Sequence, residues 1–204
     1  MSFRNFRLSE LKKRFALTTR EAAGLFARCT PVEPSALLVG ALRRGIPLGT
    51  AIGNEKARSE MIVTPVLLEL KELAPGVSIF SGVELTGDAE IGLSGICDFV
   101  LSRSAEQMYL SSPVVAVVEA KKEDMAGGLG QCLAEMISAR MFNEREGTPA
   151  PILYGVVTTG TNWKFLSLEG STVAIDLDDY SIAEPARLLG ILLAMATGAA
   201  IGPS

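Results

Sequence analysis

The chain has 204 residues, of which 48% are hydrophobic and 21% charged, so it can form one domain with a full core and is not disordered. Its formal net charge is −4 and it contains no histidine. This excludes Ser-His-Asp triads and His-ligated metal sites, so metal binding would have to use carboxylates, which select hard ions such as Mg²⁺, Mn²⁺ or Ca²⁺.

The first part of the chain has the pattern of a helical extension. Residues 3–28 are expected to be helical, because Leu8, Leu11 and Phe15 recur at helical spacing. Within this range, Thr18 or Thr19 together with Glu21 could cap a second helix that runs through Ala27. A short helix is expected over residues 36–44, ended by Gly45 and Pro47. We therefore predict a helical N-terminal extension over residues 1–50.

Charge is distributed unevenly along the chain. Residues 1–20 contain six basic residues and only one acid, Glu10, which gives +5 and leaves −9 on the remainder. A basic N-terminal arm on an acidic body could contact phosphates. A solvated helix face explains the same pattern equally well.

The rest of the chain, residues 51–204, predicts a mixed α/β sheet with helices packed on it, in one domain with the extension. Asn54 is a good N-cap for a helix to about Leu73, in which Pro65 should cause a kink or mark a second start. Strands, a helix, a further strand, a hairpin and a last helix follow (strands 77–85, 93–102 and one within the stretch 112–123; helix 129–143; strand 152–158; hairpin 163–168 and 171–177; helix from Pro185).

The C-terminal run over residues 188–202 is apolar but shorter than the roughly 20 residues that a bilayer span requires. We interpret it as a core or dimer helix, which favours a homodimer and no membrane association. The chain start lacks the apolar core of a signal peptide, and the three cysteines (Cys29, Cys97 and Cys132) are far apart, which favours reduced thiols in a cytoplasmic protein.

Two strands carry charges where apolar residues are expected. Asp98 lies in the middle of an apolar strand, and Glu119 and Lys121 follow the buried run 114–118 with their side chains on one side of the strand. Because a short connection makes these strands neighbours, we expect the three side chains to converge at one edge of the sheet. Two nearby carboxylates favour a bound cation, and the Ala120 carbonyl is a possible further ligand.

The pattern resembles the PD-(D/E)xK nuclease superfamily, and is closest to the nuclease-like domains of type I restriction enzymes and related hypothetical proteins. The similarity covers roughly residues 54–168 and rests on five segments in order (Ser59 to Leu68, with a glutamate and then a proline; Gly95 to Asp98; Val118 to Lys121; Gly130-Gln131; Tyr154 to Phe165). Cys97 replaces the motif proline, and Glu135 stands where relatives often have an aromatic residue.

The resemblance implies a restriction-endonuclease-like core with the order αβββαβ. It implies that Asp98 and Glu119 bind Mg²⁺ or Mn²⁺, with Ala120 as a further ligand, and that Lys121 is the catalytic lysine. Glu60 would support the metal or its water, and Gln131 would help to position the substrate backbone. The implied activity is hydrolysis of phosphodiester bonds in nucleic acid, most simply DNA.

Two other interpretations stay open. The chain could be a catalytically silent module that binds nucleic acid or a protein on the same fold. It could also be a soluble α/β domain whose buried charges are structural.

Overall fold

An eight-stranded mixed sheet forms the centre of the computed structural model, which describes residues 3–199. The strand order is β1-β7-β6-β5-β4-β3-β2, and β8 pairs with β6. The pairs β4·β5 and β1·β7 are parallel, and the other pairs are antiparallel. The strand bounds are β1 (Thr18–Ala22), β2 (Ser78–Asp88), β3 (Leu93–Ser102), β4 (Val114–Ala120), β5 (Ile152–Thr158), β6 (Asn162–Glu169), β7 (Thr172–Asp176) and β8 (Tyr180–Ser181).

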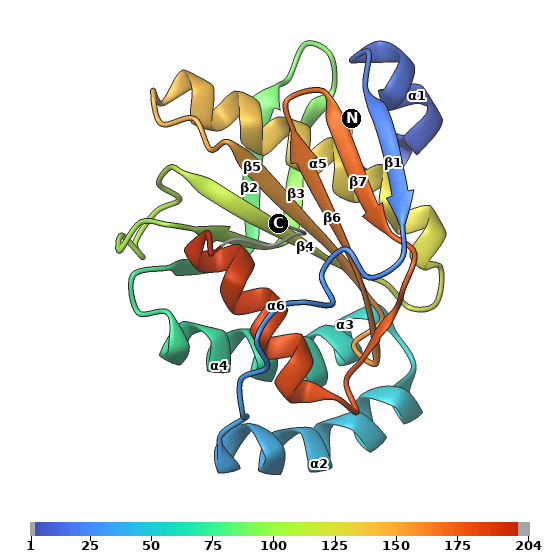
Figure 1. Ribbon diagram of the computed structural model, residues 1–204, viewed down its shortest axis with the longest axis vertical. Helices are drawn as coiled ribbons and strands as arrows, with labels where there is room; N and C mark the ends of the chain where they lie inside the picture. The colour runs from blue at the N-terminus through green and yellow to red at the C-terminus, as the bar shows by residue number, and fades with distance from the viewer. Residues whose placement is uncertain (1–2, 200–204) are drawn as a thin grey trace.

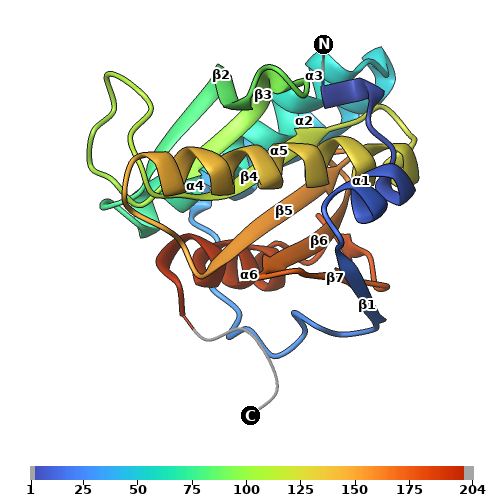
Figure 2. The same ribbon diagram turned by 90° about the horizontal axis from the view of Figure 1, so that it is seen from above.

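Helices cover both faces of the sheet, with α6 in front of it and α5 behind it in the view of Figure 1. The face on the side of α5 also carries η1 and α1 (Figure 2), whereas α2, α4 and α6 share the core of the opposite face. The helix bounds are η1 (Phe3–Asn5), α1 (Leu8–Arg14), α2 (Ala36–Ile52), α3 (Glu55–Arg58), η2 (Ser59–Val63), α4 (Thr64–Leu73), α5 (Met125–Arg145) and α6 (Pro185–Thr197).

The predicted order of elements after residue 50 is confirmed. The segment from α4 to β5 runs helix, three strands, helix, strand, and the strands over 93–102 and 152–158 have the predicted bounds. All seven residues of β4 are buried, as its apolar run predicts for a strand covered on both faces. The helix α5 begins at Met125, four residues earlier than predicted, because the Asp124 side chain caps it by accepting from the Gly127 N–H.

The predicted helix through Ala27 is wrong. Residues Thr18–Ala22 form β1, which pairs in parallel with β7 and places Thr19 opposite Val173. The local capping pattern is overridden because the edge of the sheet supplies hydrogen-bond partners for this backbone. The N-terminal part is therefore not a separate helical extension, since it contributes a strand to the central sheet.

The predicted end of α2 at Gly45 is also wrong, because this helix continues to Ile52. A β-carbon on Gly45 would lie 2.0 Å from the Met61 carbonyl oxygen, so this glycine permits close helix packing and does not end the helix. The helix ends at Gly53, which adopts the left-handed conformation with φ of 69°.

The long helix predicted from Asn54 to Leu73 is present, with an irregular middle. Asn54 caps α3 by accepting from the Ala57 N–H, and η2 is a π-helical segment that leads into α4. Pro65 is in the first turn of α4, directly after the π-helical segment, and Val63 and Thr64 before it are in the right-handed helical conformation. Pro65 therefore marks a second helix start, which was one of the two predicted outcomes.

The apolar residues of α6 pack against the sheet and are buried in the core of the chain itself (Leu188, Leu189, Ile191, Leu192, Met195 and Ala196). Their hydrophobicity therefore does not require a second chain, and the end of the predicted run, residues 200–202, lies outside the described residues. Within residues 3–199, no helix is long and apolar enough to cross a membrane.

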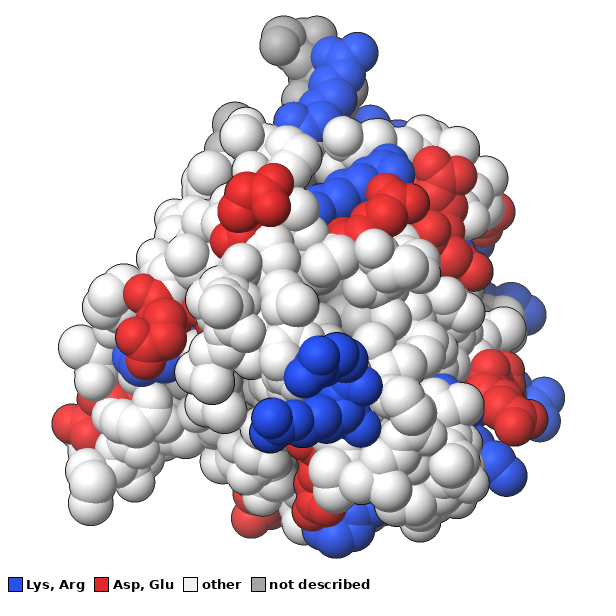
Figure 3. All heavy atoms as spheres, turned by 90° about the horizontal axis from the view of Figure 1, so that it is seen from below, with Lys and Arg blue, Asp and Glu red and all other residues white. Residues whose placement is uncertain are grey.

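One broad surface carries little charge. Figure 3 shows the side of the molecule on which α2 lies in Figure 1, and most of this face is neither acidic nor basic. Leu37 of α2 and Leu68 of α4 are 82% and 62% exposed, and both line an apolar hollow between the two helices. Arg43 and Arg44 are exposed on the same helix, α2.

Candidate metal centre at the ends of β3 and β4

The strands β3 and β4 separate at the end where the motif residues lie. Their last paired residues at this end are Phe99 and Val118, so Asp98 and Glu119 come next on the two strands. The ladder is continued by a side chain, because the Ala120 N–H donates to Asp98 Oδ2 over 2.8 Å. Asp98 is thereby fixed to the backbone of β4 at the point where this strand ends.

Four buried or largely buried side chains form a closed ring on the α5 side of the sheet, which we call the Glu119–Lys121 ring. Lys121 Nζ donates to Glu119 Oε1 over 2.6 Å and to Gln131 Oε1 over 2.9 Å. Gln131 Nε2 donates to Glu135 Oε1 over 3.0 Å, and Glu135 contacts Glu119 through a carboxyl–carboxyl hydrogen bond that closes the ring. The ring contains two acids, one ammonium and one amide.

The protonation of the ring follows from its burial. Glu119 and Glu135 are both fully buried, and burial raises the pKa of each carboxyl. The charge of Asp98 raises the pKa of Glu119 further, whereas Lys121 lowers it; the charge of Glu119 raises the pKa of Glu135. Oε2 of each glutamate is buried and lacks a hydrogen-bond partner if both are ionised. We therefore place a proton on Glu135, from which it donates to the Glu119 carboxylate.

Lys121 is held in place from two directions. Its backbone N–H donates to the Thr158 carbonyl at the end of β5 over 2.7 Å. A β-carbon on Gly128 would lie 2.7 Å from Val157 Cγ1 and 3.2 Å from Lys121 Cγ, so only glycine lets α5 begin this close to the lysine stem. Only 13% of the lysine side chain is exposed.

Asp98 opens on the other side into a solvent-accessible cavity of about 280 Å³, which we call the strand-end cavity. Glu60 of η2 lies on its wall and is paired with Lys56 over 2.7 Å, and Glu55 of α3 is paired with Arg4 over 3.8 Å. The cavity is lined by Arg4, Glu55, Lys56, Ser59, Glu60, Thr64, Ser81, Gly82, Asp98 and Ala120.

The predicted site residues therefore fall into two groups. Asp98, Ala120 and Glu60 line the strand-end cavity, whereas Glu119, Lys121 and Gln131 belong to the buried ring behind it. Glu119 is not among the residues that line the cavity. Within residues 3–199, no group of three or more Asp, Glu, Cys or His side chains is arranged so that it could hold a metal ion.

A hard divalent ion with few protein ligands fits the donors that are present. Mg²⁺ typically keeps several waters and takes only one or two carboxylates, so three clustered acids are not required. Asp98 supplies a carboxylate at the cavity, and burial raises its pKa, whereas Glu119 lies in the buried ring and contacts Lys121 and Glu135. Glu60 lies on the cavity wall, where it is paired with Lys56.

Two residues at the site were not among the predicted site residues, Glu135 and Arg4. Glu135 interrupts the apolar residues of α5 one helical turn after Gln131, and a buried acid at that spacing is a recognisable signal of a side-chain pair. Arg4 comes from η1, far from the motif in sequence, and only the folded chain places it at the cavity.

Comparison of the chain with known proteins gives no match to a protein-family model, to a curated protein or to a solved structure.

Proposed function

We propose that the chain is a restriction-endonuclease-like, PD-(D/E)xK-type nuclease that hydrolyses phosphodiester bonds in nucleic acid, most simply DNA, with Mg²⁺ or Mn²⁺. The observation that carries the proposal is the hydrogen bond from the Ala120 N–H to Asp98, which joins the acid of β3 to the Glu119-Ala120-Lys121 end of β4. The helix–three strands–helix–strand order, with β4 and β5 parallel, agrees with the core that such an enzyme needs.

Asp98, Glu119 and the Ala120 carbonyl would hold the divalent ion, which lowers the pKa of a bound water and neutralises charge on a phosphate. Lys121 would act from the ring behind the cavity, where Glu119 and Gln131 fix the position of its ammonium. Glu60 would orient water from across the strand-end cavity. Gln131 would act through Lys121, since its amide oxygen accepts from the lysine and faces the ring.

The test is cleavage of supercoiled plasmid and of single-stranded DNA with Mg²⁺ or Mn²⁺. Asp98→Asn is the most informative variant, since an amide oxygen can still accept from the Ala120 N–H while the negative charge is lost. We expect a loss of cleavage of at least about 100-fold in Asp98→Asn, the scale on which electrostatic groups act in catalysis, and none in the exposed neighbour variant Lys122→Ala. Equal, chelator-insensitive cleavage by wild type and Asp98→Asn would overturn the proposal.

A second candidate is a catalytically silent nucleic-acid- or protein-binding module on the same fold. It is favoured by the position of Glu119, which is committed to the buried ring and does not line the cavity. In that case nucleic acid or protein would bind equally well with and without divalent ions, and no DNA would be cleaved. Metal-dependent cleavage that Asp98→Asn abolishes would exclude this candidate.

A further inference from the structure

We propose that Arg4, supplied by the N-terminal segment, holds a backbone phosphate of the nucleic acid at the strand-end cavity and so acts as a positioning residue. The inference rests on the proposed function for its ligand and adds a residue that lies outside the motif. Its ligand chemistry is the phosphodiester backbone, which DNA and RNA share.

The N-terminal segment is fixed against the site by its two aromatic side chains. Phe3 is 1% exposed, and a β-carbon on Gly95 of β3 would lie 2.9 Å from its ring. Phe6 is also buried, and a β-carbon on Gly130 of α5 would lie 2.4 Å from the Phe6 carbonyl oxygen. Phe3 and Phe6 flank Arg4 in the sequence, and each packs closely against a glycine of a different element, β3 or α5. These two contacts hold the segment in one position.

Arg4 points from this anchored backbone into the strand-end cavity. It lines the cavity together with Asp98, and its guanidinium approaches Glu55 to 3.8 Å with 65% of the side chain exposed. With 65% of its side chain exposed, the guanidinium is accessible to a phosphate that enters the cavity. Arginine also has the planar donor fork that binds phosphate oxygens in pairs.

The charges of the cavity show why a cation from outside the motif is needed. Three carboxylates line it, Glu55, Glu60 and Asp98, against two cations, Arg4 and Lys56. Lys56 is engaged by Glu60 at 2.7 Å, and its pKa is raised by that hydrogen bond. Without Arg4 the lining would hold three carboxylates against Lys56 alone, so Arg4 reduces the repulsion that an anionic backbone meets, and a divalent ion would reduce it further.

The experiment measures binding of a short DNA duplex and, in a second arm, a single-stranded RNA, as a function of salt and in the presence of Ca²⁺. Four proteins are compared: wild type, Arg4→Ala, Arg4→Lys and the control Arg7→Ala. Arg7 belongs to the same segment and is exposed, but it does not line the cavity. Thermal unfolding confirms that each variant folds.

We expect Arg4→Ala to bind about 10-fold more weakly, with a log–log salt slope shallower by roughly 0.9 on duplex DNA and 0.7 on single strands, the values for one lost phosphate contact. Arg4→Lys should restore the slope, and Arg7→Ala should match wild type. Equal slopes for wild type and Arg4→Ala, or equal losses in Arg4→Ala and Arg7→Ala, would overturn the assignment.

The two proposals fail separately. Wild-type cleavage that Asp98→Asn abolishes, together with unchanged binding by Arg4→Ala, would remove the role of Arg4 and leave the nuclease standing. Weakened binding by Arg4→Ala in a protein that cleaves nothing would remove the nuclease and leave the phosphate contact.

Discussion

At the scale of single residues, the Glu119–Lys121 ring balances desolvation against hydrogen bonding. Glu135 can be fully buried because a proton neutralises it and because Gln131 and Glu119 engage its oxygens. Glu119 stays charged because Lys121 is bonded to it. The contribution of the ring to the stability of the fold therefore depends on its protonation state.

The pH dependence of stability should come from Glu135. Its pKa is raised in the folded protein, so its stabilising contribution is fully present below the ordinary glutamate pKa and is lost as the pH rises through the folded-state pKa. Glu135→Gln replaces the protonated acid by a neutral group of the same shape. We expect the variant to equal wild type near pH 5 and to exceed it progressively at higher pH, by at most about 1.4 kcal/mol per pH unit, in urea unfolding.

Two results would contradict this assignment. One is a variant that is less stable than wild type at every pH, which would mean that Glu135 is ionised and needed as an anion. The other is an unchanged pH profile, which would mean that the buried proton lies elsewhere.

Removal of the ammonium should be costly for the same reason. Lys121→Met leaves the Glu119 carboxylate buried without its cation, and we expect a loss of about 3–5 kcal/mol of unfolding free energy at neutral pH. The loss should shrink as the pH falls, because Glu119 then takes up a proton. Lys122→Met, at the exposed next position, should change stability by less than about 0.5 kcal/mol in the same unfolding measurement. Equal losses in the two variants would show that Glu119 does not depend on Lys121.

At the scale of elements, the strands that the sequence predicts well are those with a continuous buried run, such as β4 and β5. Their apolar residues determine where they lie, so local pattern and tertiary packing agree. β1 has no such pattern: its residues are polar and largely exposed, and it becomes a strand only because β7 lies beside it. The pairing of distant segments is not encoded in the local sequence.

The same distinction applies to the candidate site. The neighbouring positions of Asp98 and Glu119 were predictable, because a short connection joins two strands that pair. The separation of these acids into a cavity and a ring was not predictable, since it depends on how α5 lies against the end of β4 and carries Glu135 to Glu119.

Two glycines of α2 should respond in opposite ways to the same substitution. A β-carbon on Gly45 would collide with the Met61 carbonyl of η2, whereas one on Gly40 would meet nothing within 4 Å. Gly40→Ala should therefore stabilise by about 0.5–1 kcal/mol through helix propensity. Gly45→Ala should destabilise by about 1–3 kcal/mol or more, because the two helices must move apart. Similar unfolding free energies for the two variants would contradict the packing of α2 on η2.

At the scale of the whole molecule, the N-terminal part of the chain belongs to the domain and is not an appendage. Phe3, Leu11 and Leu17 are core residues, and β1 completes one edge of the sheet. Deletion of residues 1–20 would remove these core residues and most of β1, so point substitutions such as Arg4→Ala are the appropriate test of this segment.

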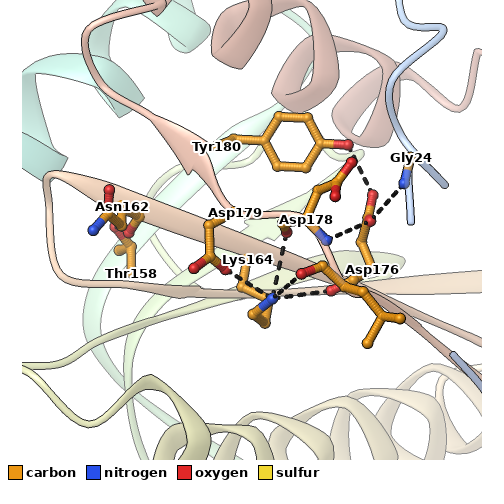
Figure 4. A network of polar contacts seen from close by, with 9 residues as sticks. Gly24, Thr158, Asn162, Lys164, Asp176, Asp178, Asp179 and Tyr180 are labelled. Atoms are coloured by element: carbon orange, nitrogen blue, oxygen red, sulfur yellow. Dashed lines mark hydrogen bonds and ion pairs between the residues drawn. The ribbon is translucent and has the colours of Figure 1, made fainter. Parts of the chain in front are cut away.

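The chain that follows β1 is tied to β7 by Asp176, which lies at the centre of the network in Figure 4. Its fully buried carboxylate accepts from the backbone N–H groups of Gly24, Phe26 and Asp178 and from the Tyr180 hydroxyl, at 2.8 to 3.1 Å. We expect Asp176→Asn to lose about 2–4 kcal/mol of unfolding free energy, because an amide offers one acceptor where the carboxylate offers two. Asp178→Asn is the exposed control, and equal stability of the two variants would contradict this role.

The proposed nuclease activity requires a divalent ion bound at the ends of β3 and β4. Electron paramagnetic resonance of Mn²⁺ measures this binding directly, without nucleic acid, in wild type, Asp98→Asn and the exposed control Glu123→Gln. We expect saturable binding by wild type and Glu123→Gln, and at least about 10-fold weaker binding by Asp98→Asn, the scale on which single groups of a metal site act. Equal binding by wild type and Asp98→Asn, or no binding by wild type, would contradict this expectation.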